Sequence, residues 1–178
     1  MGYTTNFVGE FSVEPALKDE HREYLEMFAE TRRMQRDPAI ASTLPDPLRE
    51  AVGLPIGEDG GYFVGPVPES IGEGVFGARG QAKDDSVTDY NTPPTGQPGL
   101  WCQWVPSEDG SLIVWDEGEK FYYYVDWLRY LIEHFLKPWG YRVDGEVEWC
   151  GEDSWDDRGK IVVDDNQVTR LAARIVYE

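Results

Sequence analysis

A glycine- and proline-rich stretch from Gly53 to Gly99 constrains the fold of this chain more than any other feature. It holds 11 of the 19 glycines and 6 of the 12 prolines. Connections without secondary structure are uncommon beyond about 12–15 residues in a compact domain, and those that occur are usually functional or disordered. The end of the stretch runs into two tryptophans, within Gly96–Trp104, which argues against a mere linker. We therefore expect a functional insertion that folds back over the domain, with Gly65–Asp84 as its mobile part.

The segments on both sides of this stretch have clear periodic patterns. Tyr24, Leu25 and Phe28 recur at helical spacing, and the Asp109-Gly110 pair is typical of a hairpin turn between two apolar runs. The patterns predict strands at Tyr3–Val13, Leu100–Val105, Ser111–Trp115, Tyr141–Trp149, Lys160–Val163 and Val168–Val176, and helices at Lys18–Arg36, Asp46–Val52 and Phe121–Leu136.

This order of elements predicts an α+β fold with a mostly antiparallel sheet and two main helices on one face. We expect a single domain over residues 1–178, with the Gly/Pro-rich insertion at 53–99. The first six elements follow the order of a split βαβ, ferredoxin-like unit, although order alone does not fix the positions of the strands.

The charge of the chain limits its partners. It has 16 Lys and Arg against 34 Asp and Glu, a net charge of −18. Such a charge repels nucleic acid and anionic membrane surfaces, so neither is expected as a direct partner. It suits an ordinary acidic protein, a basic protein partner, or mimicry of DNA by a carboxylate surface. A homo-oligomer is left open.

Two cysteines, Cys102 and Cys150, are too few for a disulfide scaffold. No apolar run approaches the roughly 20 residues that span a bilayer, and the first residues lack the apolar core of a signal peptide. The sequence thus predicts reduced thiols in a cytoplasmic protein.

Three arginines, Arg32, Arg33 and Arg36, lie at the predicted end of the first long helix. In a helix, Arg32 and Arg36 continue the row of Phe28, which faces inward, and a buried arginine needs a partner. A guanidinium suits a carboxylate or a phosphate bidentately. These arginines either pair with carboxylates of the chain or bind an anionic ligand.

Aromatic residues are the second candidate group: Tyr62, Tyr90, Trp101, Trp104 and Trp115. Rings that stack on a base and guanidiniums that hold phosphate make a nucleotide pocket, although such residues are more often part of the core. In a strand, Trp101 and Trp104 point to opposite faces, so at most one lines a site. The glycines of Gly57–Gly65 expose backbone N–H groups but lack the lysine of a phosphate-binding P-loop.

Metal and nucleophile chemistry have little support in the sequence. His21 and His134 lie on or beside apolar helix faces, and no recognisable zinc spacing exists. The acidic residues between Glu146 and Asp157 do not match a calcium-binding loop. We expect no cofactor, no metal site and no assigned catalytic residue.

Several blocks of the chain resemble a family of uncharacterised proteins of bacteriophages and prophages. The blocks are MGYTTNFVGEF, HREYLEMFAETRRMQRD, LPDPLREAVGLPIGEDGGYFVG, DYNTPPTGQPGLWCQW, EKFYYYVDWLRYLIEHFLKPWGY and GEVEWCGE. This resemblance implies a phage accessory protein, one possibility being an anti-defence protein. It implies no catalytic residue.

Three functional hypotheses follow. The first is a phage accessory protein that binds an anionic small molecule such as a nucleotide through Arg32, Arg33, Arg36, Tyr62, Tyr90, Trp101 and Trp104. The second is an acidic interaction protein or DNA mimic that blocks a host protein. The third is a hydrolase acting on a nucleotide or phosphorylated substrate, which the lack of an acid/base constellation disfavours.

Overall fold

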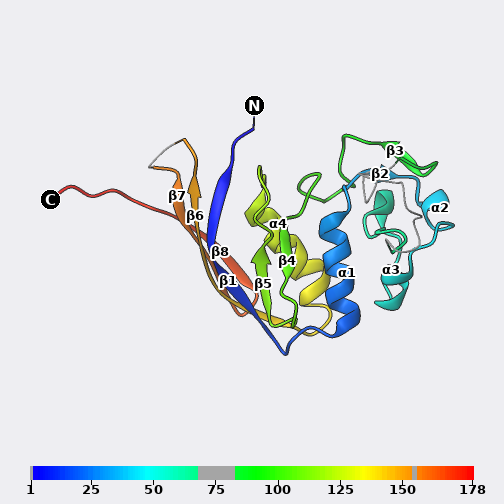
Figure 1. Ribbon diagram of the computed structural model, residues 1–178, viewed down its shortest axis with the longest axis horizontal. Coiled ribbons are helices and arrows are strands. Elements are labelled where there is room, and N and C mark those ends of the chain that lie inside the picture. The colour runs from blue at the N-terminus through cyan, green and yellow to red at the C-terminus, as the bar shows by residue number, and fades with distance from the viewer. Residues whose placement is uncertain (1, 68–82, 154–155) are drawn as a thin grey trace. The chain divides into compact units, whose positions relative to one another are not determined.

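The computed structural model describes residues 2–67, 83–153 and 156–178 (Figure 1). The chain forms two compact units: unit 1 consists of Met1–Leu17 and Gln103–Glu178, and unit 2 of Lys18–Cys102. The Gly/Pro-rich stretch lies in unit 2. Its expected mobile part, Gly65–Asp84, falls for residues 68–82 outside the described residues. The expectation of a single domain stays a prediction.

Unit 1 is built on one large antiparallel sheet. Its strands are β1 (Thr5–Glu14), β4 (Trp104–Pro106), β5 (Leu112–Trp115), β6 (Arg142–Gly151), β7 (Arg158–Asp164) and β8 (Gln167–Ala172). The spatial order is β4-β5-β1-β6-β7-β8, and every neighbouring pair is antiparallel. The prediction of a mixed fold with a mostly antiparallel sheet is confirmed. The strand pairing is not that of a split βαβ unit, which requires a parallel pair.

One face of this sheet is apolar and buried because apolar residues alternate with polar ones along the long strands. Phe7, Phe11 and Val13 of β1 are buried, as are Val147 and Trp149 of β6, while the residues between them are more exposed. The alternation explains why these segments form strands with one buried side.

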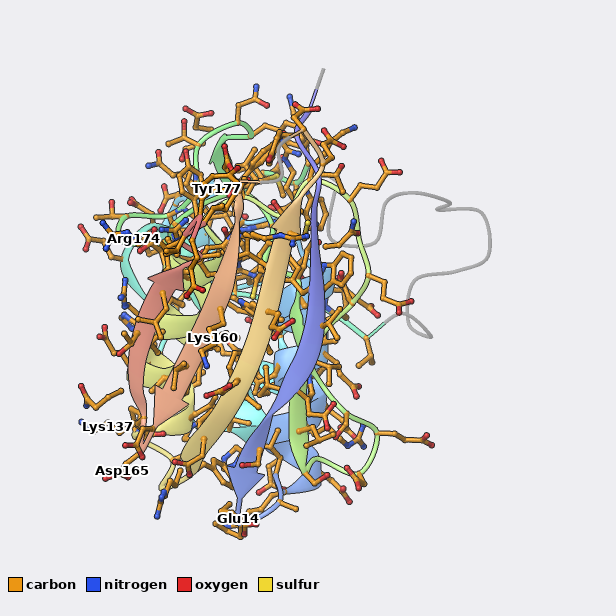
Figure 2. All side chains as sticks on the ribbon, turned by 90° about the vertical axis from the view of Figure 1, so that its left-hand side faces the viewer. Glu14, Lys137, Lys160, Asp165, Arg174 and Tyr177 are labelled. Atoms are coloured by element: carbon orange, nitrogen blue, oxygen red, sulfur yellow. The ribbon has the colours of Figure 1, made fainter. Side chains whose placement is uncertain are left out.

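The buried face of the sheet lies against α4 (Tyr124–Leu131), which continues into a π-helical turn, η3 (Ile132–Leu136). The helix buries Trp127, Leu128 and Leu131. Figure 1 shows α4 on one side of the strands, and Figure 2 looks at the opposite face of the same sheet, over which no helix of unit 1 lies. Unit 1 is therefore a two-layer structure with one open sheet face.

Unit 2 begins with α1 (Asp19–Glu30) and continues through short elements. These are β2 (Gln35–Arg36), α2 (Pro38–Ala41), α3 (Pro47–Ala51), the 3-10 turn η1 (Glu58–Gly60) and β3 (Val87–Asp89). Strands β2 and β3 pair antiparallel. Tyr24, Leu25 and Phe28 of α1 are buried together with Phe63. Because α1 belongs to unit 2, the placement of both long helices on one face of the sheet stays a prediction.

Among the described residues, no helix has the length and apolar character required to pass through a lipid bilayer.

Candidate functional site

The predicted helix Lys18–Arg36 is six residues too long, because α1 ends at Glu30. Thr31 has extended backbone angles, and its hydroxyl donates a hydrogen bond to the carbonyl of Met27 at 2.7 Å. That bond satisfies a carbonyl at the helix end, where no further backbone donor is present. The extended segment Thr31–Arg36 follows, so Phe28, Arg32 and Arg36 do not form a helical row. Each of the three arginines instead has its own set of partners.

Arg33 is buried and holds two distant parts of the Gly/Pro-rich stretch. Its Nη2 donates to the carbonyl of Gly61 at 2.7 Å, and its Nε donates to Oε1 of Gln97 at 3.2 Å. Gln97 donates to the same Gly61 carbonyl at 2.6 Å. The guanidinium carbon lies 4.1 Å from the ring centre of Phe28. These contacts make Arg33 a structural link of unit 2.

Arg36 is also buried, and it pairs with a carboxylate. Its Nη1 lies 2.7 Å from Oδ2 of Asp84 and 2.8 Å from the hydroxyl of Ser86. Its guanidinium carbon lies 4.2 Å from the ring centre of Phe63. Burial alone would raise the pKa of Asp84, but hydrogen bonds from Ser86 and Arg36 outweigh it and lower the pKa. Arg36 thereby fixes the chain immediately after Lys83.

Arg32 lies beside Tyr90 and is only half-buried. Its Nε donates to the carbonyl of Tyr90 at 3.0 Å, and its Nη2 donates to Oδ1 of Asn91 at 3.1 Å. The guanidinium carbon lies 4.1 Å from the centre of the Tyr90 ring, and Nζ of Lys83 lies 5.0 Å from the same centre. Two cations thus meet at one aromatic ring.

Neither Arg32 nor Lys83 forms an ion pair with a carboxylate of the described residues. The acceptors of Arg32 are a carbonyl and an amide, both neutral. Arg22 of α1 shows the contrast: it lies 2.8 Å from Glu26 and within 4.0 Å of Asp19. Positive charge at Tyr90 is therefore held in place without an ion pair to any carboxylate in the part of the chain that the structure describes.

The remaining predicted site residues lie elsewhere. Tyr62 is half-buried, its carbonyl accepts a hydrogen bond from the hydroxyl of Tyr24 at 2.9 Å, and burial raises the pKa of its phenol. Trp101 is half-buried and precedes β4. Trp104 belongs to unit 1 and is buried there, with its indole N–H donating to the carbonyl of Tyr124 at 2.7 Å. The structure brings Arg32 and Tyr90 together, and it gives Arg33 and Arg36 separate partners.

Trp104 is part of an aromatic cluster in the core of unit 1. The ring of Phe7 lies 5.3 Å from Trp104, 5.9 Å from Phe121 and 4.8 Å from Tyr124, with edge-to-face geometry in each case. Edge-to-face pairs stabilise a core beyond the area that they bury. Among the described residues, these contacts account for the burial of Trp104 without a ligand.

Sequence reasoning missed Lys83 as a site residue. The next two residues, Asp84 and Asp85, are acidic, so the sequence alone suggests that the charge of Lys83 is neutralised locally. In the structure, Asp84 is used by Arg36 and Ser86, which leaves Lys83 directed at Tyr90. The spacing of residues in the sequence does not show that Asp84 pairs with Arg36 rather than with Lys83.

Asp46 and Arg49 form a buried pair that also holds the stretch. The helix α3 begins next to Asp46, within the range predicted at Asp46–Val52, but the Asp46 carboxylate makes no cap bond. It accepts from Nε of Arg49 at 2.7 Å and from the backbone N–H of Gly65 at 3.1 Å. Burial raises the pKa of Asp46, opposed by Arg49. The pair connects α3 to the stretch before residue 68.

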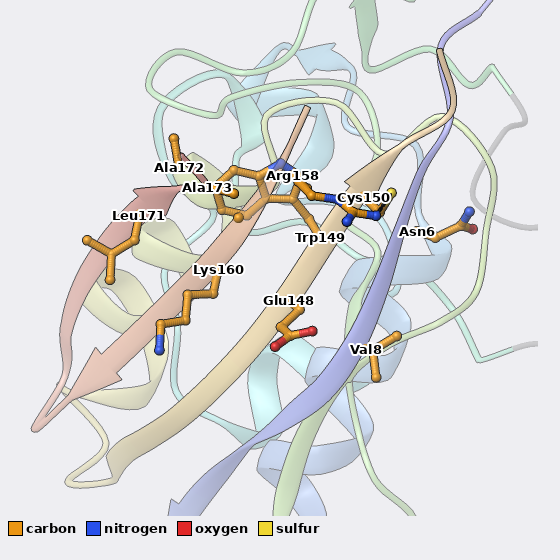
Figure 3. Close-up of a pocket in the computed structure, with 11 residues that line it drawn as sticks. Asn6, Val8, Glu148, Trp149, Cys150, Arg158, Lys160, Leu171, Ala172 and Ala173 are labelled. Carbon is orange, nitrogen blue, oxygen red and sulfur yellow. Dashed lines mark hydrogen bonds between the residues drawn. The ribbon is translucent and has the colours of Figure 1, made fainter. Parts of the chain in front are cut away.

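The open face of the unit 1 sheet carries the second candidate surface. A shallow groove of about 550 Å³ runs across β1, β6, β7 and β8 (Figure 3). Its lining includes Val8, Glu148, Lys160 and Leu171. The groove is lined by both apolar and charged side chains, which is typical of a surface that meets a protein rather than of a substrate pocket.

No group of three or more His, Cys, Asp or Glu side chains within residues 2–67, 83–153 and 156–178 is arranged to hold a metal ion. Burial lowers the pKa of His21. Cys102 and Cys150 form no disulfide in the structure.

No family model matches the chain, and no curated protein or solved structure matches it. The resemblance to phage proteins stays a prediction.

Proposed function

We propose that the protein binds an anionic small molecule, such as a nucleotide, at Arg32, Lys83 and Tyr90. One observation supports this function most: two cations meet at one tyrosine ring, and no described carboxylate pairs with either. The chain has 34 Asp and Glu against 16 Lys and Arg, so carboxylates outnumber cations about two to one. A cationic pair left without one is suited to an anion that arrives from solution.

The arrangement of Arg32 and Lys83 should be more stable with a phosphate bound than without one. Like charges near one aromatic ring repel each other, and an anion that bridges them removes the repulsion. Hydrogen bonds from Arg32 to the Tyr90 carbonyl and to Asn91 fix the orientation of the guanidinium. A guanidinium fixed in this way loses little further entropy when it binds an anion. The Tyr90 ring, which is half-buried, supplies an aromatic edge for a nucleobase.

Arg33 and Arg36 act in this proposal as positioning residues. Arg36 holds Asp84 and so the backbone next to Lys83, and Arg33 holds Gly61 and Gln97. Tyr62, Trp101 and Trp104 have no part in the proposed site. In a phage, a protein with this activity would remove a host signalling nucleotide from solution.

Thermal-shift measurements with pyrophosphate, ATP, ADP and uncharged adenosine test the proposal. A ligand that binds only the folded state raises the unfolding midpoint by mass action. We expect shifts with the anions and none with adenosine, and loss of the shift in Arg32→Gln and in Lys83→Gln. Arg22→Gln is the matched control, because Arg22 lies on α1 of the same unit and pairs with carboxylates.

Absence of a shift with every anion would contradict the proposal and favour the acidic interaction protein. A shift of equal size in wild type, Arg32→Gln and Lys83→Gln would show that the anion binds elsewhere. A shift with release of phosphate from ATP would favour the hydrolase.

A further inference from the structure

One row of residues on the open face of the unit 1 sheet has a charge pattern that is complementary to itself. Four residues stand side by side across four strands: Val8 of β1 faces Glu148 of β6, Glu148 faces Lys160 of β7, and Lys160 faces Leu171 of β8. Figure 3 shows this row crossing the groove. From one end to the other it reads apolar, acidic, basic, apolar. We name these four residues the central row.

Both ends of the central row are exposed apolar side chains. Val8 has 72% of its surface exposed and Leu171 has 45%. Scattered exposed apolar residues are ordinary, but these two flank a groove that no helix of unit 1 covers. The face therefore has exposed apolar side chains on both sides of Glu148 and Lys160, and Nζ of Lys160 also lies 3.2 Å from a carboxylate oxygen of Glu146 in the same chain.

A third apolar element leaves the sheet next to the groove. After β8, Ala173 donates to the carbonyl of Arg158 at 2.8 Å, and the chain then continues as Arg174–Glu178 without regular structure. Within this exit segment Ile175 is 54% exposed, Val176 73% and Tyr177 90%. In Figure 1 the segment runs away from the sheet on the side opposite to α4, which is the side of the open face.

We propose that the open face binds the open face of a second copy of this chain, related by a two-fold axis that runs parallel to the strands between β6 and β7. Such an axis exchanges the two halves of the central row. It places Val8 against Leu171 of the second copy and Glu148 against Lys160 of the second copy, each contact occurring twice. Homodimers of this symmetry need one self-complementary patch, and the central row provides it.

The charges select this axis over the alternative. A two-fold axis that runs along the central row, perpendicular to the strands, places Glu148 against Glu148 and Lys160 against Lys160. Like charges brought together in an interface cost several kcal/mol. Two sheets with nearly aligned strands are also a common packing arrangement, with side chains of both inner faces meeting in a layer about 10 Å thick.

The size of the face explains the role of the exit segment. Four strands about 4.8 Å apart and about seven residues long give a projected area on the order of 450 Å². A standard interface buries about 800 Å² on each partner, so the face alone is small for a stable dimer. The exit segment, with Ile175, Val176 and Tyr177 uncovered, adds apolar area on the side from which the second copy approaches.

Mixing of two charge-reversed variants tests the proposal. In Lys160→Glu, the contact becomes acid against acid, and in Glu148→Lys it becomes base against base, so each variant alone is expected to dimerise at least about tenfold more weakly. An equimolar mixture restores both opposite-charge contacts, and sedimentation equilibrium should show heterodimers. Ile40→Asp, on the exposed side of α2 in unit 2, is the control that leaves dimerisation unchanged.

A second measurement reports the geometry directly. Val8 and Leu171 of one chain are separated by β6 and β7, about 14 Å, which is beyond the reach of a disulfide. Oxidation of Val8→Cys/Leu171→Cys in a Cys150→Ser background should therefore give a cross-linked dimer and no cross-link within a chain. A monomeric wild type at every concentration, failure of the mixture to dimerise, or no cross-linked dimer would each overturn the proposal.

Discussion

Arg32 and Tyr90 are joined twice, by a 3.0 Å hydrogen bond from Nε to the tyrosine carbonyl and by a 4.1 Å approach of the guanidinium to the ring centre. The Arg32 guanidinium makes both contacts, one to the backbone of Tyr90 and the other to its ring. Lys83 approaches the same ring at 5.0 Å. This rigid group, with no described carboxylate partner, is the basis of the proposed anion site.

Arg33 should matter for stability rather than for binding. Arg33→Met removes the donors to Gly61 and Gln97 from a buried position and should lower the free energy of unfolding by roughly 2 kcal/mol. Urea unfolding measures the loss. Arg22→Met, which breaks partly exposed ion pairs on α1, should cost less than about 1 kcal/mol. Equal losses in the two variants would contradict the buried link.

The buried pair of Asp46 and Arg49 should be sensitive to the loss of one partner. Asp46→Ala leaves the Arg49 guanidinium buried without its carboxylate and removes the acceptor of the Gly65 N–H. We expect a loss of about 3–5 kcal/mol in the free energy of unfolding. Glu50→Ala, an exposed change on the same helix, is the control. A loss below about 1 kcal/mol for Asp46→Ala would show that the pair is not needed.

Gly145 lies where strands β1 and β6 approach closely. Its φ is +138°, and a Cβ atom there would stand 2.7 Å from the carbonyl oxygen of Glu10. Gly145→Ala should therefore destabilise unit 1 by roughly 2 kcal/mol, from strain and steric overlap together. Gly140 also has a positive φ, +92°, but open space around it. Gly140→Ala should lose less in the same thermal unfolding measurement, because only the backbone strain applies.

The contribution of Asp109 to the stability of the β4–β5 turn should depend on pH in the acid range. Hydrogen bonds from the hydroxyl and backbone N–H of Ser111, and from Ser107, lower the pKa of Asp109 to about 2. A carboxyl with a lower pKa in the folded state stabilises that state above its ordinary pKa of 3.8 and loses the effect as pH falls toward 2. Titration followed by NMR measures the pKa. In Asp109→Asn the stability difference from wild type should be full at neutral pH and vanish near pH 2, and a difference that does not change with pH would contradict this origin.

The layered part of the fold was predictable from the sequence because periodicity decides it. Strands β1 and β6 alternate apolar and polar residues, and the turn between β4 and β5 contains the expected Asp109-Gly110 pair. The helix that ends at Glu30 was predicted six residues too long. Its continuation is helix-compatible in sequence, but Arg33 N–H bonds the carbonyl of Leu100 and Gln35 pairs with Asp89. Tertiary pairing with residues far along the chain overrides the local preference there.

The candidate site was predictable only in part, for the same reason. The arginine cluster and Tyr90 stood out by residue type, and Arg32 does lie on Tyr90. The burial and partners of each arginine depend on long-range contacts. Arg33 and Arg36 are held by Gly61, Gln97 and Asp84, which lie far along the chain. The Gly/Pro-rich stretch has no periodic pattern from which these contacts could be predicted. For the same reason, the sequence did not identify Lys83 as a site residue.

Isothermal titration calorimetry of the wild type and of Arg32→Gln/Lys83→Gln with ATP tests whether Arg32 and Lys83 bind the anion. We expect binding to the wild type that weakens as the salt concentration rises, because charge–charge attraction dominates this binding. We also expect a loss of at least about a hundredfold in affinity in the double variant, on the order of two charge-assisted contacts. Unchanged affinity in the double variant, with the fold intact by circular dichroism, would contradict the account.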